Sequence, residues 1–301
     1  MNHETVAPTM AENSVEELAC SVLTDSLTSV RRWLKRAARE WADDDEIVHQ
    51  LRVFSRRALS ALNLFEVLLP ESEVRWFRKR VKAVLQAAGR ARDLDVLMTI
   101  QLRRCGNARK IVAKQWRAER AAAQKPLVKL WRKLHHHDRF RKHVQLLVGN
   151  LKTVAADGEH DIRLVCDERI LPQFAGLCRS VVNALGHETD VRSLHGLRIA
   201  VKRLRYAATQ LLPVFKSQKL PEMVKILEEL QTQLGEMHDH VVAKQELKRS
   251  AARLKKHSHQ KILRELIDSE TRRIADSVAT YRGWLNSDAC RELKQCIESI
   301  V

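Results

Sequence analysis

A nine-residue stretch that occurs twice constrains this chain more than any other feature. The first copy, HQLRVFSRR, begins at His49, and the second, HGLRIAVKR, begins at His195, 146 residues later. On a helix, positions i, i+3 and i+7 lie within about 60° of one another, so each copy places one histidine and two cations on one face. These residues are His49, Arg52 and Arg56 in the first copy, and His195, Arg198 and Lys202 in the second.

A row of like charges along one helix edge is unfavourable, because each cation pair at i,i+4 spacing costs roughly 0.2–0.5 kcal/mol. A bound polyanion would remove that cost. Apolar positions in and after the first copy supply surface for a core: Leu51, Val53, Ala58, Leu62 and Phe65. Two such helices facing each other would form an anion site. The alternative is a solvated basic face, but cations that recur at matched positions favour the site.

The composition predicts an all-α protein. Only 9 glycines and 6 prolines occur in 301 residues, which leaves few turns and long elements. No run alternates apolar and polar residues as a half-buried strand would. Helical spacing of apolar residues predicts helices at about 14–41, 46–68, 71–88, 90 onward, 107–134, 138–155, 160–185, 190–212, 221–234, 240–257, 259–286 and 289–299.

Local signals refine these expected boundaries. Residues 1–13 are expected to form a disordered lead-in. Gly89 is the expected stop of the 71–88 helix, and Asp93 is the expected N-cap of the next one. Pro126 is expected to start or kink a helix, because proline lacks the backbone N–H that a helix interior needs.

A second landmark repeats at the same offset of 146 residues. The matched pairs are Gly89 with Gly235, Asp93 with Asp239, and Lys79 with Lys225. Two landmarks that share one offset indicate an internal duplication. We therefore expect two related helical halves, 14–157 and 158–301, each a four-helix-type bundle, with the boundary at Asp157-Gly158.

These residues resemble the CHAD domain, a family named for conserved histidines in an α-helical domain. The resemblance lies in the pattern H-x-L-R-[VI]-x-x-[RK]-R and in the turn G-x-x-[RH]-D, each present twice, and it covers nearly the whole chain after residue 13. His195–Tyr206 (HGLRIAVKRLRY) is similar to the second-half motif, and Gly89–Leu97 (GRARDLDVL) to the first-half turn. The resemblance implies two pseudo-symmetric bundles with a basic central channel that binds inorganic polyphosphate.

Carried over by position, the resemblance implies two sets of polyphosphate contacts. The first set is His49, Arg52, Arg56, Lys82, His195, Arg198, Lys202 and Arg205. The second set is Arg57, Arg75, Lys79, Arg203 and Lys225. Two departures predict unequal use of the halves, with one end of the channel binding better. Ala58-Leu59-Ser60 stands where the second copy has Leu-Arg-Tyr, and Glu228 stands opposite Lys82.

The formal net charge of +17 favours an acidic partner. Inorganic polyphosphate is the expected partner, with polyphosphate granule proteins or polyphosphate-metabolising enzymes as associated proteins. Nucleic acid is expected only as a competing, non-specific polyanion, since aromatic residues make up 5% of the chain and base stacking needs them. Without a secretory signal, a run of 18 apolar residues or a CxxC pair, the chain is expected to be cytoplasmic, with no membrane partner. The resemblance to the CHAD domain implies, in addition, association with polyphosphate granules.

No catalytic residue, metal or cofactor is expected. His49 and His195 have no metal-ligating residue at i+4, although a core histidine is an alternative for each. Carboxylates at 93, 95 and 239 are expected to cap helices or pair with Arg90 and Arg92, with Mg²⁺ binding as the alternative. Histidines at 135–137, 143, 238, 240, 257 and 259 are expected on exposed basic surface. A nucleic-acid-binding helical protein and a polyphosphatase or its regulatory subunit are the alternative functions.

Overall fold

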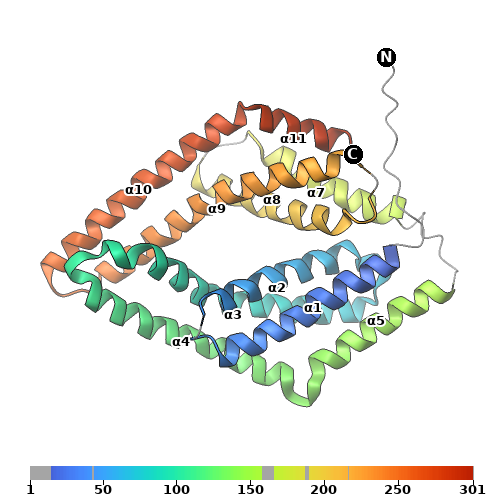
Figure 1. The fold of residues 1–301 in the computed structure, drawn as a ribbon, viewed down its shortest axis with the longest axis horizontal. Helices are drawn as coiled ribbons and strands as arrows, with labels where there is room; N and C mark the ends of the chain where they lie inside the picture. The colour runs from blue at the N-terminus through green and yellow to red at the C-terminus, as the bar shows by residue number, and fades with distance from the viewer. Residues whose placement is uncertain (1–14, 43, 158–165, 187–189, 216, 301) are drawn as a thin grey trace.

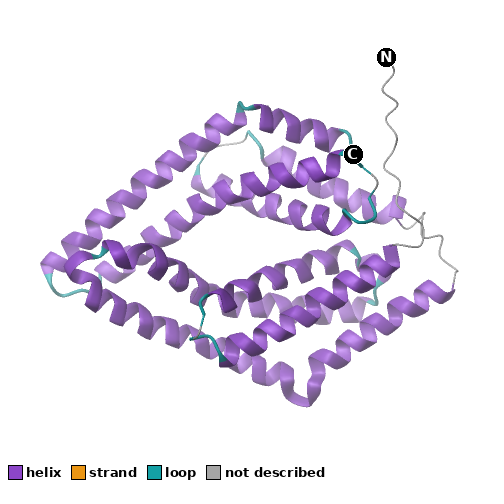
Figure 2. Cartoon of the chain, in the orientation of Figure 1, coloured by secondary structure: helices purple, strands orange, loops and turns teal. Residues whose placement is uncertain are grey.

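The computed structural model describes residues 15–42, 44–157, 166–186, 190–215 and 217–300. Within these ranges nearly every residue is helical and no strand occurs, which confirms the all-α prediction (Figure 2). The predicted lead-in at 1–13 lies outside the described residues. Gly158 also lies outside them, so the boundary between the two halves stays a prediction, as does the internal duplication itself.

The helices follow one another with short connections. They are α1 (Val15–Arg39), α2 (Glu46–Leu64), α3 (Glu71–Gln101), α4 (Arg109–His135), α5 (Arg139–Asp157), α7 (Leu171–Ala184), α8 (Val191–Leu211), α9 (Lys219–Ala251), α10 (His257–Leu285) and α11 (Asp288–Glu298). Short 3-10 turns lie at Glu66–Leu68, Leu102–Arg104, Gly106–Ala108 and His136–Asp138, and a π-helical turn at Cys166–Ile170 precedes α7.

The helices form two groups that lie side by side. Figure 1 shows α1, α2, α3 and α5 in one group and α7, α8, α9 and α11 in the other, with α4 and α10 along the outer edges. Contacts between the groups include α2 with α8 and α3 with α9. The two helices that carry the duplicated stretch are therefore direct neighbours.

Two clusters of buried apolar side chains hold the groups together. The larger cluster draws on helices from both groups and includes Leu51 of α2 and Leu197 of α8. The smaller cluster lies where the C-terminal parts of α3 and α9 meet the N-terminal parts of α4 and α10, at the left of Figure 1. Because the groups are joined both along α2 and α8 and at this far end, their spacing is fixed.

Helix α8 shows why the duplicated stretch presents its cations on one side. Its buried apolar residues recur at helical spacing: Leu194, Leu197, Val201 and Leu204. Asp190 caps the helix, since its Oδ1 accepts two backbone N–H hydrogen bonds in the first turn, at 2.6 and 3.0 Å. With the apolar edge held in the core, the neighbouring edge with Arg198 and Lys202 faces α2.

Several predicted helix ends are wrong. Helices α3 and α9 run without a break through Gly89 and Gly235. Apolar residues on both sides of these glycines are buried, among them Ala91, so tertiary packing outweighs the roughly 1 kcal/mol that glycine costs in a helix. Asp93 therefore lies inside α3 and is not an N-cap. Helix α4 likewise neither begins nor ends at Pro126, which is exposed.

A buried ion pair ties α3 to α4. Arg120 Nε donates to Asp95 Oδ1 at 2.6 Å, and each side chain is 4% exposed. The Arg120 guanidinium also lies over the Trp41 ring, 4.7 Å from its centroid. The predicted pairing of Asp95 with Arg90 or Arg92 is therefore wrong.

Replacing Arg120 by leucine should lower the free energy of unfolding by about 3–5 kcal/mol, because it leaves the Asp95 carboxylate buried without its partner. The double variant Arg120→Leu/Asp95→Leu should recover most of this loss, since no unpaired charge remains. Urea unfolding measures both. As a control, Arg75→Leu breaks an ion pair whose side chains are 75% and 80% exposed, and should cost less than about 1 kcal/mol. Equal losses at the two sites would contradict the assigned importance of burial.

Candidate anion-binding cavity

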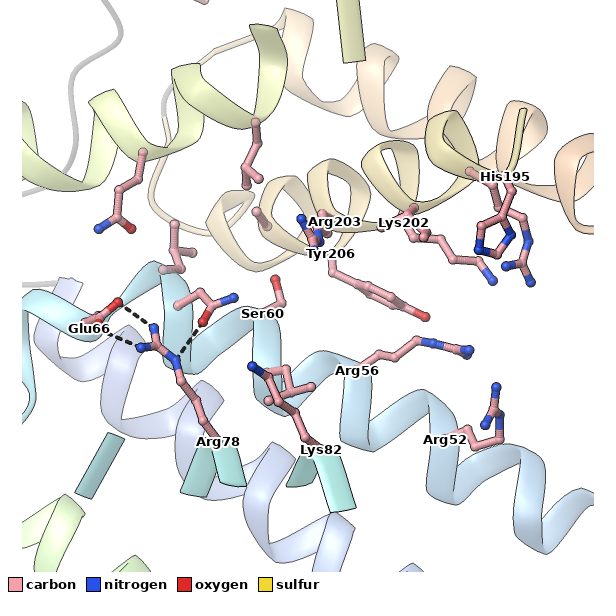
Figure 3. A pocket seen from close by; sticks show the side chains of 18 of the residues that line it. Arg52, Arg56, Ser60, Glu66, Arg78, Lys82, His195, Lys202, Arg203 and Tyr206 are labelled. Atoms are coloured by element: carbon pink, nitrogen blue, oxygen red, sulfur yellow. Dashed lines mark hydrogen bonds and ion pairs between the residues drawn. The ribbon is translucent and has the colours of Figure 1, made fainter. Parts of the chain in front are cut away.

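A cavity of about 700 Å³ lies between the two helices that carry the duplicated stretch. Its walls come mainly from α2 and α8, with contributions from α3, α7 and α9 (Figure 3). The lining residues are Arg52, Arg56, Leu59, Ser60, Asn63, Leu64, Glu66, Arg78, Lys82, Gln173, Leu177, His195, Arg198, Ile199, Lys202, Arg203, Tyr206, Ala207 and His238. Within the described part of the chain, Glu66 is the single carboxylate in a lining that is rich in cations.

Cations from the two copies approach each other across this cavity. Figure 3 shows Arg52 and Arg56 extending from α2 and Lys202 extending toward them from α8. The imidazole rings of His195 and His238 lie 5.1 Å apart in the same cavity. The cavity therefore concentrates side chains that donate hydrogen bonds and carry or acquire positive charge.

Burial and the charges of neighbouring cations disfavour the charged forms of four side chains in the cavity, those of Arg52, Arg198, Lys202 and His238. The pKa of Lys202 is lowered to about 7, first by burial and then by the charges of Arg198 and Arg56. Burial and Arg56 also lower the pKa of Arg52 to about 10, and the same two causes lower the pKa of Arg198. Burial, followed by Arg198, lowers the pKa of His238 to about 3. The free protein therefore holds positive charge that its own residues do not fully compensate.

Arg52 and Arg198 occupy matched positions but are held differently. Arg52 Nη1 donates to the backbone carbonyl oxygen of Leu85 at 3.1 Å. A Cβ at Gly89 would lie 3.6 Å from that Nη1, an ordinary van der Waals contact, so an alanine would also fit there. Arg198 Nε, by contrast, is buried without a hydrogen-bond partner among the residues that the structure describes. An anion in the cavity would supply the missing acceptor.

Two half-buried carboxylates lie near these cations without lining the cavity. Asp93 interacts electrostatically with Arg52. Asp239 interacts in the same way with Arg198 and Lys202. Burial raises the pKa of both carboxyl groups, and the neighbouring cations act against that rise. Throughout the described ranges, no group of three or more histidine, cysteine, aspartate or glutamate residues is arranged to hold a metal ion.

The structure brings part of the predicted site together. The predicted residues that line the cavity are Arg52, Arg56, Lys82, His195, Arg198, Lys202 and Arg203. Those that do not line it are His49, Arg57, Arg75, Lys79, Arg205 and Lys225. Arg75 and Lys79 line a smaller hollow nearby, and Lys225 is exposed on α9. His49 is half-buried, and burial followed by the charge of Arg92 lowers its pKa.

Arg205 and Arg57 have local partners that account for their positions. Arg205 turns toward α9, where its Nε donates to Gln231 Oε1 at 2.8 Å and its Nη1 to Glu228 Oε1 at 3.2 Å. The Arg57 guanidinium lies 5.4 Å from the centroid of the Phe54 ring. The side chain of Glu228, the residue that breaks the match with Lys82, thus binds an arginine that was expected in the channel.

Three lining residues were missed as site residues: Arg78, Tyr206 and His238. His238 lies within the second glycine–aspartate landmark, Tyr206 ends the longer motif quoted above, and Arg78 is one helical turn from Lys82. Each residue thus lies in or beside a sequence feature already noted, but only the packing of α3, α8 and α9 shows that the three side chains reach one cavity.

The expectation of exposed histidines is correct for residues 135–137 and 257, whereas residues 143, 238, 240 and 259 are half-buried. His238 is half-buried in the cavity. His143 Nδ1 lies 2.7 Å from Glu73 Oε2, and His240 Nδ1 lies 2.7 Å from Glu270 Oε2. These acidic partners are 70 and 30 residues away in sequence, so the sequence pattern did not reveal them.

Anion binding should take up protons, because a bound polyanion favours the charged form of Lys202, whose pKa in the free protein is about 7. At pH 8 we expect up to one proton per bound tripolyphosphate, and affinity should fall by up to about tenfold per pH unit above 7. Calorimetric titration in two buffers with different protonation enthalpies measures this uptake. In Lys202→Arg, whose side chain stays charged, the uptake should disappear. Identical heats for the wild-type protein in both buffers would contradict the assignment.

The fold resembles two solved structures. The crystal structure of the CHAD domain from the plant Ricinus communis matches with a TM-score of 0.68 and 23% sequence identity, over 95% of this chain and 96% of that chain. PptA from Streptomyces chartreusis matches with a TM-score of 0.58 and 15% identity, over 97% of this chain and 100% of that chain. At these identities the likeness establishes a shared fold. A search of curated proteins found no match.

The family model of the CHAD domain matches residues 25–248. This range includes both copies of the duplicated stretch and both glycine–aspartate landmarks, and it covers most of the chain. The chain therefore belongs to the CHAD domain family.

Proposed function

We propose that the protein binds inorganic polyphosphate in the cavity between α2 and α8, and that it does so without catalysing a reaction. Membership of the CHAD domain family supports a polyphosphate-associated role. The observation that carries the proposal is the convergence of Arg52, Arg56, Arg198 and Lys202 from two helices on one cavity. Their charges repel one another in the free protein, and a linear polyanion relieves that repulsion.

The chemistry of the lining suits a phosphate chain. Arginine offers a planar fork of donors to phosphate oxygens, and lysine offers a point charge. Arg198 Nε is a buried donor that lacks an acceptor within the described part of the chain. We propose that the cavity belongs to a basic channel between two duplicated halves, and that a phosphate chain threads along the cations of α2 and α8.

We propose a binding role rather than a catalytic one, because the carboxylates near the cavity already interact electrostatically with its cations. Asp93 interacts with Arg52, and Asp239 with Arg198 and Lys202. Incubation of the purified protein with polyphosphate and Mg²⁺ should release no orthophosphate above a no-protein control. Sustained, metal-dependent release would contradict this part of the proposal and favour a polyphosphatase.

We further propose that binding directs the protein to polyphosphate granules, where it meets granule proteins or polyphosphate-metabolising enzymes. Across the described residues, no helix is both long enough and apolar enough to cross a bilayer.

Charge reversal at the site should abolish binding. In Arg198→Glu/Lys202→Glu, affinity for polyphosphate should fall by at least about a hundredfold, because each reversal loses a buried charged contact worth about 2–5 kcal/mol. The new carboxylates can pair with Arg52 and Arg56, so circular dichroism should show a retained fold. Arg272→Glu/Arg273→Glu is a matched control that makes the same charge change at two exposed positions of α10 outside the cavity. Equal losses in both variants would move the site elsewhere.

Polyphosphate should outcompete duplex DNA of equal total charge, because a cavity between two packed helices admits a single phosphate chain and not a duplex. Binding should weaken with salt through counterion release, with a log–log slope of about −3.5 to −4.2 if five or six lining cations each contact a phosphate. Fluorescence competition at several salt concentrations measures both quantities. Equal affinity for DNA would instead favour the nucleic-acid-binding alternative.

A further inference from the structure

A second hollow of about 310 Å³ adjoins the first along α3. It shares Glu66, Arg78 and Lys82 with the larger cavity and adds the cations Arg75 and Lys79. Glu71 also lines it, and the exposed Glu71 Oε1 accepts a hydrogen bond from Arg75 Nη2 at 2.5 Å. Arg75 and Lys79 were expected to contact polyphosphate, yet they do not line the larger cavity. The shared residues therefore lie at the border between two cationic spaces, and their arrangement decides whether one ligand can occupy both.

A hydrogen-bonded bridge occupies this border. Arg78 Nη1 and Nη2 donate to the two carboxylate oxygens of Glu66 at 2.8 and 2.5 Å, and Arg78 Nε donates to Asn63 Oδ1 at 2.9 Å (Figure 3). Three of the five N–H donors of the guanidinium are thus used within the protein, and one N–H on each of Nη1 and Nη2 remains. Arg78 lines both spaces, but while this bridge is intact its charge is paired with Glu66 and fewer of its donors are open to a phosphate.

Glu66 also places a negative charge at the border, which Arg78 offsets from one side. Glu66 is the single carboxylate among the described residues that line the larger cavity, and its side chain is 41% exposed. The hydrogen bonds from Arg78 lower the pKa of this carboxyl group, so it is ionised at neutral pH. A phosphate chain that extends from Lys202 toward Lys79 must therefore pass an exposed carboxylate, which repels it.

The bridge is present at one end only. At the offset of 146 residues, the positions matched to its three members are Thr209, Leu212 and Val224, which cannot form the same ion pair. The cations of the duplicated stretch recur in both halves, whereas this bridge occurs only in the first. The Glu66–Arg78 bridge is therefore a feature of the first half and does not follow from the duplicated pattern of cations.

We propose that the second hollow is an accessory phosphate subsite, and that the Glu66–Arg78 bridge restricts its use so that chain length beyond the larger cavity adds little affinity. This inference rests on the proposed polyphosphate-binding function. The bridge makes the protein bind short chains nearly as tightly as long ones. When it opens, long chains alone gain the contacts of Arg75 and Lys79.

Glu66→Gln tests the proposal, because it removes the charge while glutamine can still accept a hydrogen bond from Arg78. Affinities for tripolyphosphate and for a chain of about a hundred phosphates are measured by titration at fixed salt. We expect the affinity for the long chain to rise by about threefold to tenfold, as for two added surface charge contacts, and that for tripolyphosphate to change by less than about twofold. The salt slope for the long chain should steepen by about 1.4 for two added contacts.

Two further variants separate this effect from a general change in charge. Glu228→Gln is the matched control, since it removes an equal charge from a carboxylate that also pairs with an arginine but lines neither space. It should leave both affinities unchanged. In Glu66→Gln/Arg75→Gln/Lys79→Gln, the gain for the long chain should disappear.

The possible results have distinct meanings. A length-independent gain in Glu66→Gln, an equal gain in Glu228→Gln, or a gain that survives loss of Arg75 and Lys79 would overturn the proposal. So would no change in any variant, while leaving the proposed function intact if the wild-type protein binds polyphosphate. Failure of the wild-type protein to bind either chain would overturn both.

Discussion

Repulsion among half-buried cations is the interaction on which the rest of this structure depends. Arg52, Arg56, Arg198 and Lys202 share one cavity, and the charge of Arg56 disfavours the charged forms of the other three. Such an arrangement costs folding free energy, so it persists only because a large apolar core holds α2 against α8. The cationic side chains are thus already held together before a polyanion binds. Binding therefore costs no further free energy to bring them together.

The carboxylates near the cavity determine how much of that charge remains available. Asp93 and Asp239 compensate part of it from positions that do not line the cavity. Glu66 instead lines the cavity and accepts two of the N–H donors of Arg78. At the far end of the molecule, by contrast, charge is compensated locally, because the buried carboxylate of Glu270 is paired with Arg104 and His240. Uncompensated positive charge is therefore concentrated where the two motif helices meet.

The spacing of the duplicated stretch predicts a cationic face on each of two helices, because helical periodicity fixes which residues share a face. It does not fix that the two faces meet, which was expected from the duplication and the family resemblance, and it wrongly groups His49 with the residues that line the cavity. Boundaries were less predictable. Gly89 lies inside a helix since the apolar residues around it are buried, which depends on tertiary packing. Arg205 has the right spacing but turns to Gln231 and Glu228 on another helix. His238 and Arg78 reach the cavity from α9 and α3, and no local pattern encodes that approach.

The most direct test of the central claim is the thermal unfolding midpoint of Lys202→Met at pH 6, below the pKa of about 7 at which Lys202 loses its charge. If repulsion in the free cavity is real, this variant should unfold at a temperature about 1–2 °C above that of the wild-type protein, as for roughly 1 kcal/mol of added stability in a chain of 301 residues. Polyphosphate should then raise its midpoint less than it raises that of the wild-type protein. A lower midpoint for the free variant, together with an undiminished response to polyphosphate, would contradict the claim.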